Sequence, residues 1–155
     1  MTAEAYFYEI EPYPAAWLRN LWPAARVDER SICDLAPAEI TLYRRVHLFA
    51  GIGGWEYALE LAGWPADRTV WTGSCPCQPF SVAGKRRGVA DERHLWPVMR
   101  DLIAQCRPAV CFGEQVASPA GRQWLAGVRA DLEALGYAVG AADLCAASAG
   151  APHIR

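Results

Sequence analysis

The chain has no excess of basic residues, which an autonomous nucleic-acid-binding protein usually carries. Its 155 residues contain 15 lysines and arginines against 17 aspartates and glutamates, and the formal net charge is −2. Any contact with a polyanion must therefore come from a local basic patch or from a part that is missing.

The chain also has no apolar run long enough to span a membrane, and its N-terminus lacks the basic and then apolar layout of a signal peptide. These absences predict a cytoplasmic protein without membrane contact. Six cysteines in such a domain indicate free thiols and not a disulfide framework. The spacings of Cys75 with Cys77 and of Cys106 with Cys111 fit structural zinc poorly, so we expect no metal.

Apolar, β-prone runs alternate with segments of helical length, the pattern of a mostly parallel sheet with helices on both faces. A hydrophobic content of 53% suits one compact α/β domain over residues 1–155. The expected strands are Tyr6–Glu9, Val27–Cys33, Arg45–Phe49, Val70–Gly73, Ala109–Gly113 and Tyr137–Leu144. The expected helices are Pro12–Leu21, Gly53–Ala62, His94–Cys106 and Gly121–Leu135.

A cysteine between two prolines follows the strand expected at 70–73. Residues 74–81 read Ser-Cys-Pro-Cys-Gln-Pro-Phe-Ser, with Cys77 between Pro76 and Pro79. Proline fixes φ and biases the preceding residue toward extended geometry, so Cys77 is presented on a rigid segment. This suits a nucleophile better than a core thiol.

Two further segments have the features of ligand sites. Residues 47–54 read His-Leu-Phe-Ala-Gly-Ile-Gly-Gly, a glycine-rich turn between a strand and a helix. Glycine lets the backbone approach a ligand closely, and a helix N-terminus favours a carboxylate or a phosphate. Glu114 follows the strand expected at 109–113, at the end where an open α/β sheet binds its ligands.

These segments resemble the motifs of the DNA (cytosine-5)-methyltransferases. Residues 74–81 are similar to the family's Pro-Cys-Gln loop, and residues 49–54 to its Phe-x-Gly-x-Gly-Gly turn. Residues 114–116 resemble its Glu-Asn-Val motif, with glutamine in place of asparagine. Residues 150–155 resemble the start of its Gln-x-Arg-x-Arg motif, which ends here at Arg155.

The order of the motifs differs from that of the family. Residues 55–73 leave room for one helix and one strand before the cysteine loop, where the family has two more strand–helix units. Residues 8–18 instead resemble the family's Glu-Ile-Asp-Pro-Tyr-Ala segment, and residues 28–35 its following Gly-Asp-Ile-x-x-Leu unit. An unrelated N-terminal extension is the alternative.

The resemblance therefore implies an α/β, Rossmann-like fold of the S-adenosylmethionine-dependent methyltransferases, permuted at the N-terminus and truncated at the C-terminus. Residues 1–45 would hold the permuted ribose- and adenine-side units. Residues 46–155 would hold the glycine turn, the cysteine loop and the strand that leads to Glu114. The target-recognition domain is expected to be absent.

The resemblance also implies roles in catalysis. Cys77 would attack C6 of a cytosine flipped out of a DNA duplex, Glu114 would stabilise the protonated N3, and Arg155 would help to hold the substrate. The methyl group would come from S-adenosyl-L-methionine. The implied substrate contacts are Gln78, Pro79, Phe80 and Ser81. Lys85, Arg86 and Arg87 follow the expected nucleophile, and their basic side chains are candidates for phosphate contacts, with simple solvation as the alternative.

For the cofactor, the resemblance implies that Glu9 accepts the ribose hydroxyls and that Ile10 packs on adenine. Ser31 stands where the family has an aspartate for the adenine amino group, with Asp28 and Asp34 as possible substitutes. His47 is a further departure, because the family usually has an aspartate there. The implied cofactor contacts are Glu9, Ile10, Ser31, Ile32, Phe49, Ala50, Gly51, Ile52, Gly53, Gly54 and Pro76.

Three alternatives stay open. In the first, the chain is a cofactor-binding remnant, or a split subunit that needs a partner or a C-terminal half. In the second, it methylates cytosine in RNA. In the third and most distant, it is a thiol-redox protein. Because the target-recognition region is missing, we expect the isolated chain to methylate DNA weakly or not at all.

Overall fold

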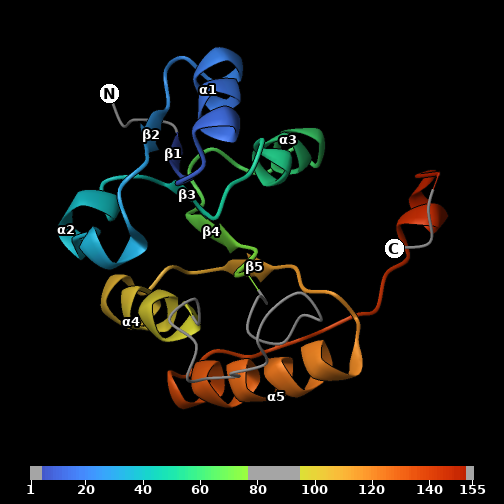
Figure 1. Cartoon of the computed structure of the whole chain (residues 1–155). Coiled ribbons are helices and arrows are strands. Elements are labelled where there is room, and N and C mark those ends of the chain that lie inside the picture. Colours follow the sequence, from blue (N-terminus) through green and yellow to red (C-terminus); the bar gives the residue numbers. More distant parts are fainter. Residues whose placement is uncertain (1–4, 77–94, 153–155) are drawn as a thin grey trace.

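The computed structural model describes residues 5–76 and 95–152 of the chain. Five parallel strands form one sheet in the order β2-β1-β3-β4-β5 (Figure 1). The strands are β1 (Ala5–Tyr8), β2 (Arg26–Asp28), β3 (Arg45–Leu48), β4 (Val70–Gly73) and β5 (Cys111–Gly113).

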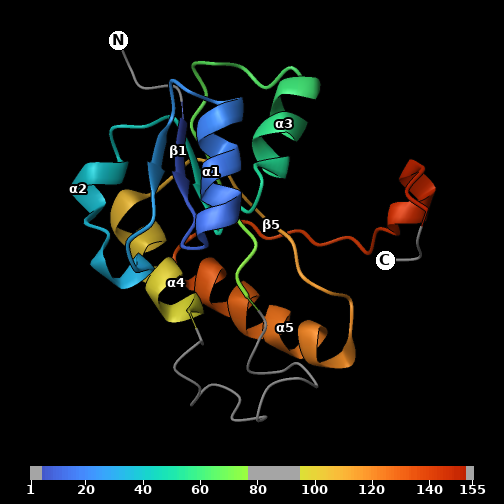
Figure 2. The same cartoon turned by 45° about the horizontal axis from the view of Figure 1, so that its top comes forward.

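Helices cover both faces of the sheet, as predicted (Figures 1 and 2). Helices α1 (Pro12–Leu21) and α3 (Gly54–Leu61) lie on one face. Helices α2 (Pro37–Ile40), α4 (Trp96–Cys106) and α5 (Pro119–Ala134) lie on the other. Two short 3-10 helices are η1 (Ile32–Asp34) and η4 (Ala146–Ala149). Within the described residues, no helix is long and apolar enough to cross a membrane.

The alternation of side chains along the strands divides the core into two parts. Tyr6 and Tyr8 of β1 face the side of α4 and pack in a cluster with Trp71 and Ile103. Phe7 faces the opposite side and packs with Leu18 of α1. All four residues of β1 are buried, which is expected of a parallel strand covered on both faces.

The sheet order agrees with the predicted permutation. If β3 is counted as the first strand, β1 and β2 take the places of the second and third, and the order reads 3-2-1-4-5 of a doubly wound sheet. The connection from β2 to β3 passes β1 and contains η1 and α2. The N-terminal strands are therefore an integral part of the sheet and not an extension.

Most predicted elements are confirmed within two residues of their ends. The strand predicted at Val27–Cys33 is wrong beyond Asp28, because the Ser31 hydroxyl accepts from the Cys33 N–H at 3.3 Å and caps η1. The strand predicted at Tyr137–Leu144 is also wrong, because a strand needs a neighbour and no described residue pairs with this segment.

Gly53, the N-cap residue of α3, lies in a tightly packed part of the turn before this helix. Its φ is +84°, and a Cβ there would lie 2.3 Å from the ring of Trp22. That ring is held by Phe7, at a centroid distance of 5.3 Å, and by a hydrogen bond to Glu60. Gly63 also has a positive φ of +63°, but nothing lies within 4 Å of its Cβ position.

We expect Gly53→Ala to lower the free energy of unfolding by about 2 kcal/mol more than Gly63→Ala, because only the first adds overpacking to backbone strain. Urea denaturation of both variants measures the difference. Equal losses would contradict the packing that we describe around Gly53.

Candidate functional site

The carboxyl ends of five parallel strands meet at one edge of the sheet, where an open α/β sheet binds its ligands. The glycine turn, the described start of the cysteine loop and the segment with Glu114 all follow strands at this edge. The permuted segment adds Glu9, directly after β1. The fold therefore gathers the predicted motifs at one edge.

The glycine turn leaves β3 through several residues of positive φ. Phe49 has a φ of 57°, Gly51 of 55° and Gly53 of 84°. The Ala50 N–H donates to the Tyr8 carbonyl at 3.0 Å, and the Gly53 N–H donates to the Ala50 carbonyl at 3.0 Å. Side chains added at Gly51 or Gly54 would meet nothing within 4 Å, so the turn borders open space.

Glu9 lies directly against this turn. Its Oε2 accepts from the Gly51 N–H at 2.7 Å, and its Oε1 accepts from the Glu11 N–H at 2.9 Å. The carboxylate is largely buried, with the residue 8% exposed. The acid predicted for the ribose thus comes from the permuted segment and contacts the predicted cofactor turn. The ribose contact itself stays a prediction.

The hydrophobic residues predicted to contact the cofactor differ in exposure. Ile10 is 51% exposed and Ile52 is 61% exposed, so both are accessible at this edge. Ile32 is 1% exposed and packs in the core, where its N–H donates to the Tyr8 hydroxyl at 3.0 Å. The Ser31 hydroxyl caps η1.

Asp28 and Asp34, the two possible substitutes for the family's aspartate, have different surroundings in the structure. Asp28 is 3% exposed and accepts from the Tyr6 hydroxyl at 2.8 Å and from the Arg30 guanidinium at 2.7 Å. Hydrogen bonds from Arg30 lower the pKa of Asp28 to about 2. Burial of the Tyr6 hydroxyl, and after it the hydrogen bond to Asp28, raises the pKa of Tyr6 above its usual range. Asp28 thus anchors the end of β2, whereas Asp34 is exposed.

Gln115 joins the two motifs that are predicted to act on the substrate. Its Nε2 donates to the Cys75 carbonyl at 3.2 Å, and its Oε1 accepts from the Val116 N–H at 2.9 Å. Cys75 and Pro76 begin the cysteine loop, and Glu114 is exposed beside Gln115. The glutamine that replaces the family's asparagine therefore ties the end of β5 to this loop. Sequence reasoning did not foresee this contact.

Several predicted residues lie outside the described part of the chain, and their roles stay predictions. They are Cys77, Gln78, Pro79, Phe80, Ser81, Lys85, Arg86, Arg87 and Arg155.

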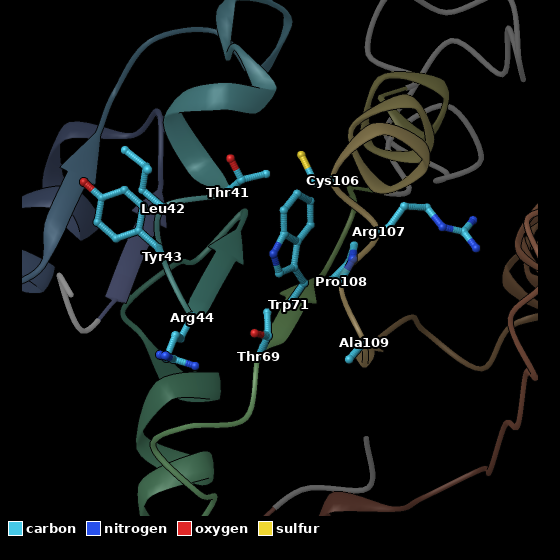
Figure 3. Close-up of a pocket in the computed structure, with 10 residues that line it drawn as sticks. All are labelled: Thr41, Leu42, Tyr43, Arg44, Thr69, Trp71, Cys106, Arg107, Pro108 and Ala109. Atoms are coloured by element: carbon cyan, nitrogen blue, oxygen red, sulfur yellow. The ribbon is translucent and has the colours of Figure 1, made fainter.

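A cavity of about 390 Å³ lies at the opposite, amino edge of the sheet (Figure 3). Figure 3 shows Trp71 at its centre, between Thr41 and Cys106. It is bordered by Arg44, which precedes β3, and by Thr69, which precedes β4. Because the glycine turn and Glu9 lie at the carboxyl edge, this cavity is separate from the candidate site.

Comparison with known proteins gives a family for these motifs. The family model of the C-5 cytosine-specific DNA methylases matches residues 64–155. The chain is 38% identical over 88 residues to the Type II methyltransferase M.AplI of Arthrospira platensis, a match that covers 56% of this chain and 26% of that protein.

Two further relatives match longer parts of the chain. The Type II methyltransferase M.HgiCII of Herpetosiphon aurantiacus is 28% identical over 138 residues, covering 63% of this chain and 32% of that protein. The Type II methyltransferase M.PspPI of Psychrobacter sp. is 29% identical over 172 residues, covering 83% and 41%. The matches thus span less than half the length of these relatives. No solved structure matches the chain.

The Asp28 anchor predicts a specific pH dependence. The folded-state pKa is about 2, below the ordinary value of 3.8, so the stabilisation is present above pH 3.8 and is lost as the pH falls through 2. The shift corresponds to about 2 kcal/mol. We expect the difference in unfolding free energy between wild type and Asp28→Asn to shrink by that amount between pH 6 and pH 2.

Urea denaturation across this pH range measures the difference. Asp143→Asn is the control, because Asp143 is 63% exposed in its pair with Arg122, and we expect it to change stability little. A difference for Asp28→Asn that stays constant with pH would contradict the lowered pKa.

Proposed function

We propose, because the chain belongs to the C-5 cytosine-specific DNA methylase family, that it binds S-adenosylmethionine at the carboxyl edge of its sheet and methylates C5 of cytosine in DNA. The observation that carries the proposal is the 2.7 Å hydrogen bond between the Gly51 N–H and Glu9. It joins two segments whose resemblance to the cofactor site was found separately in the sequence.

The residues at this edge fit the cofactor. The first N–H groups of α3 have no acceptor within the helix, and no side chain of the described residues caps them, so they suit a carboxylate. The open space beside Gly51 and Gly54 leaves room for a ligand close to the backbone. Each oxygen of Glu9 accepts one N–H and retains a lone pair that can accept a ribose hydroxyl. Exposed Ile10 and Ile52 offer apolar surface to the adenine and methionine parts.

The cofactor, when bound, supplies an electrophilic methyl group. In the proposed reaction the Cys77 thiolate adds to C6 of the cytosine, and Glu114 holds the proton on N3, which makes C6 electrophilic. Electron density then moves to C5, which accepts the methyl group. Loss of the C5 proton to a base and elimination of Cys77 complete the exchange, so one difficult step becomes two easier ones.

Glu114 is exposed, so its carboxylate is accessible to a flipped cytosine. Gln115 connects the end of β5, which Glu114 follows, to the start of the loop that contains Cys77. Flipping the cytosine out of the duplex costs a few kcal/mol, which contacts with the protein must offset. We assign phosphate contacts to Lys85, Arg86 and Arg87, and a further substrate contact to Arg155.

Recognition of the DNA sequence is proposed to come from a second subunit or from a C-terminal half of the protein. The net charge of −2 supports this, because the chain by itself has little electrostatic attraction for DNA. The matched relatives are named Type II methyltransferases, which favours DNA over RNA and a role in restriction–modification. Such a role is carried out in the cytoplasm.

The cofactor pocket is tested by calorimetric titration of S-adenosylhomocysteine into the folded chain. We expect binding by the wild type and roughly tenfold weaker binding by Glu9→Gln, because the amide retains only one acceptor oxygen. Glu29→Gln is the matched control, since Glu29 is an exposed glutamate paired with Arg19. Equal affinities for the wild type and Glu9→Gln would contradict the assigned role of Glu9.

The need for a separate recognition part is tested by transfer of a labelled methyl group to cytosine-containing duplex DNA. We expect the isolated chain to give a rate barely above that of Cys77→Ser, which has no thiolate nucleophile. Robust, sequence-specific methylation by the wild-type chain alone would show that it needs no partner.

A further inference from the structure

A buried chain of polar side chains joins α3 to β3 and β4. The Oε1 of Glu56, in the first turn of α3, lies 3.0 Å from the guanidinium of Arg45. Its Oε2 lies 2.7 Å from the Nε2 of His47, and the His47 Nδ1 lies 2.8 Å from the Thr72 hydroxyl. Because a carboxylate only accepts, the His47 Nε2–H donates to Glu56.

This network is almost completely shielded from water. Glu56 and His47 are each 1% exposed, and Arg45 is 17% exposed. Burial of charged and polar groups costs free energy that apolar side chains of similar size would not cost. Stability alone is therefore a poor reason for placing it between a helix and a sheet. Its directional contacts instead specify where α3 sits along β3.

The network flanks the glycine turn on both sides in sequence. Arg45 and His47 precede the turn on β3, and Glu56 follows Gly54 by two residues. One carboxylate thus holds two successive inward-facing residues of the strand that enters the turn. The turn itself is fixed to β1 through Glu9 and Ala50. The network supplies the corresponding support on the helix side.

We propose that Glu56, His47 and Arg45 are positioning residues that hold the first turn of α3 where it binds the carboxylate of the cofactor. This inference rests on the proposed cofactor site. It gives a role to His47, which stands where the family usually has an aspartate. In this chain the histidine is matched by Glu56, so the departure is part of a complete set of contacts.

Glu56→Gln tests the proposal, because the amide keeps the size of the side chain but replaces one acceptor with a donor. We expect the dissociation constant for S-adenosylhomocysteine to rise roughly tenfold, since a small displacement of a positioning group is costly. We also expect faster amide hydrogen exchange at Gly51, Gly53 and Gly54 in NMR spectra of the ligand-free protein.

Ile103→Val is the control for stability. Ile103 is 1% exposed in α4, on the opposite face of the sheet from α3, so its loss of a methylene lowers stability without touching the turn. Thr72→Val is a milder second variant, which removes one hydroxyl, retains the Glu56–His47 contact and is used if Glu56→Gln does not fold. We expect it to weaken binding about two- to threefold.

The outcomes separate the two proposals. Unchanged affinity in folded Glu56→Gln and in Thr72→Val, in a wild-type background that binds, would overturn the positioning role alone. A wild-type chain that binds no S-adenosylhomocysteine would overturn the proposed function. The exchange of the glycine amides does not need a ligand, so equal exchange in the wild type and the variants would also overturn the positioning role.

Discussion

The hydrogen bond between Glu9 and the Gly51 N–H is the contact on which the candidate site depends. It connects the residue that follows β1 to the turn that follows β3, two points 42 residues apart in the chain. Because β1 lies beside β3 in the sheet, their carboxyl ends are neighbours. The side chain of Glu9 is therefore long enough to reach from the end of β1 to the turn after β3. The Ala50 N–H, bonded to the Tyr8 carbonyl, fixes the same junction through the backbone. Without this junction, the permuted segment would have no part in the site.

A parallel sheet is defined by which strands are neighbours and not by their order in the chain. Phe7 of β1 is paired with Val27 on one side and with His47 on the other, so β1 is an interior strand although it comes first. The additional requirement of the permuted order is a connection from β2 to β3 that passes β1, and η1 and α2 fill it with buried Ile32 and Ile40. The family match covers residues 64–155, from just before β4 onward. The rearranged units lie in the part before it.

The sequence predicted those elements whose ends carry local signals. The helix at Pro12–Leu21 and the strand at Val70–Gly73 have the predicted ends, the first because proline is favoured in the first turn of a helix. The strand predicted beyond Asp28 failed because the hydroxyl of Ser31 offers the backbone a local hydrogen bond that competes with strand pairing. The glycine turn and Glu9 were found from their motifs, whereas the contact between Gln115 and Cys75 depends on tertiary structure. The signal for the network was His47, a polar residue between the apolar Val46 and Leu48 of β3.

The two carboxylates beside the glycine turn, those of Glu9 and Glu56, are held by contacts within the protein. Glu9 accepts two N–H groups, and Glu56 is held by Arg45 and His47. A site whose side chains are fixed before binding loses less conformational entropy when a ligand arrives. In the positioning role that we propose, the buried polar contacts between α3 and the sheet contribute to the same preorganisation. An apolar interface would allow the helix to shift along β3, and the position of its first turn would then vary with it. Directional contacts restrict this shift, and under the proposed function that restriction keeps the glycine turn at a fixed distance from the strand end that carries Glu114.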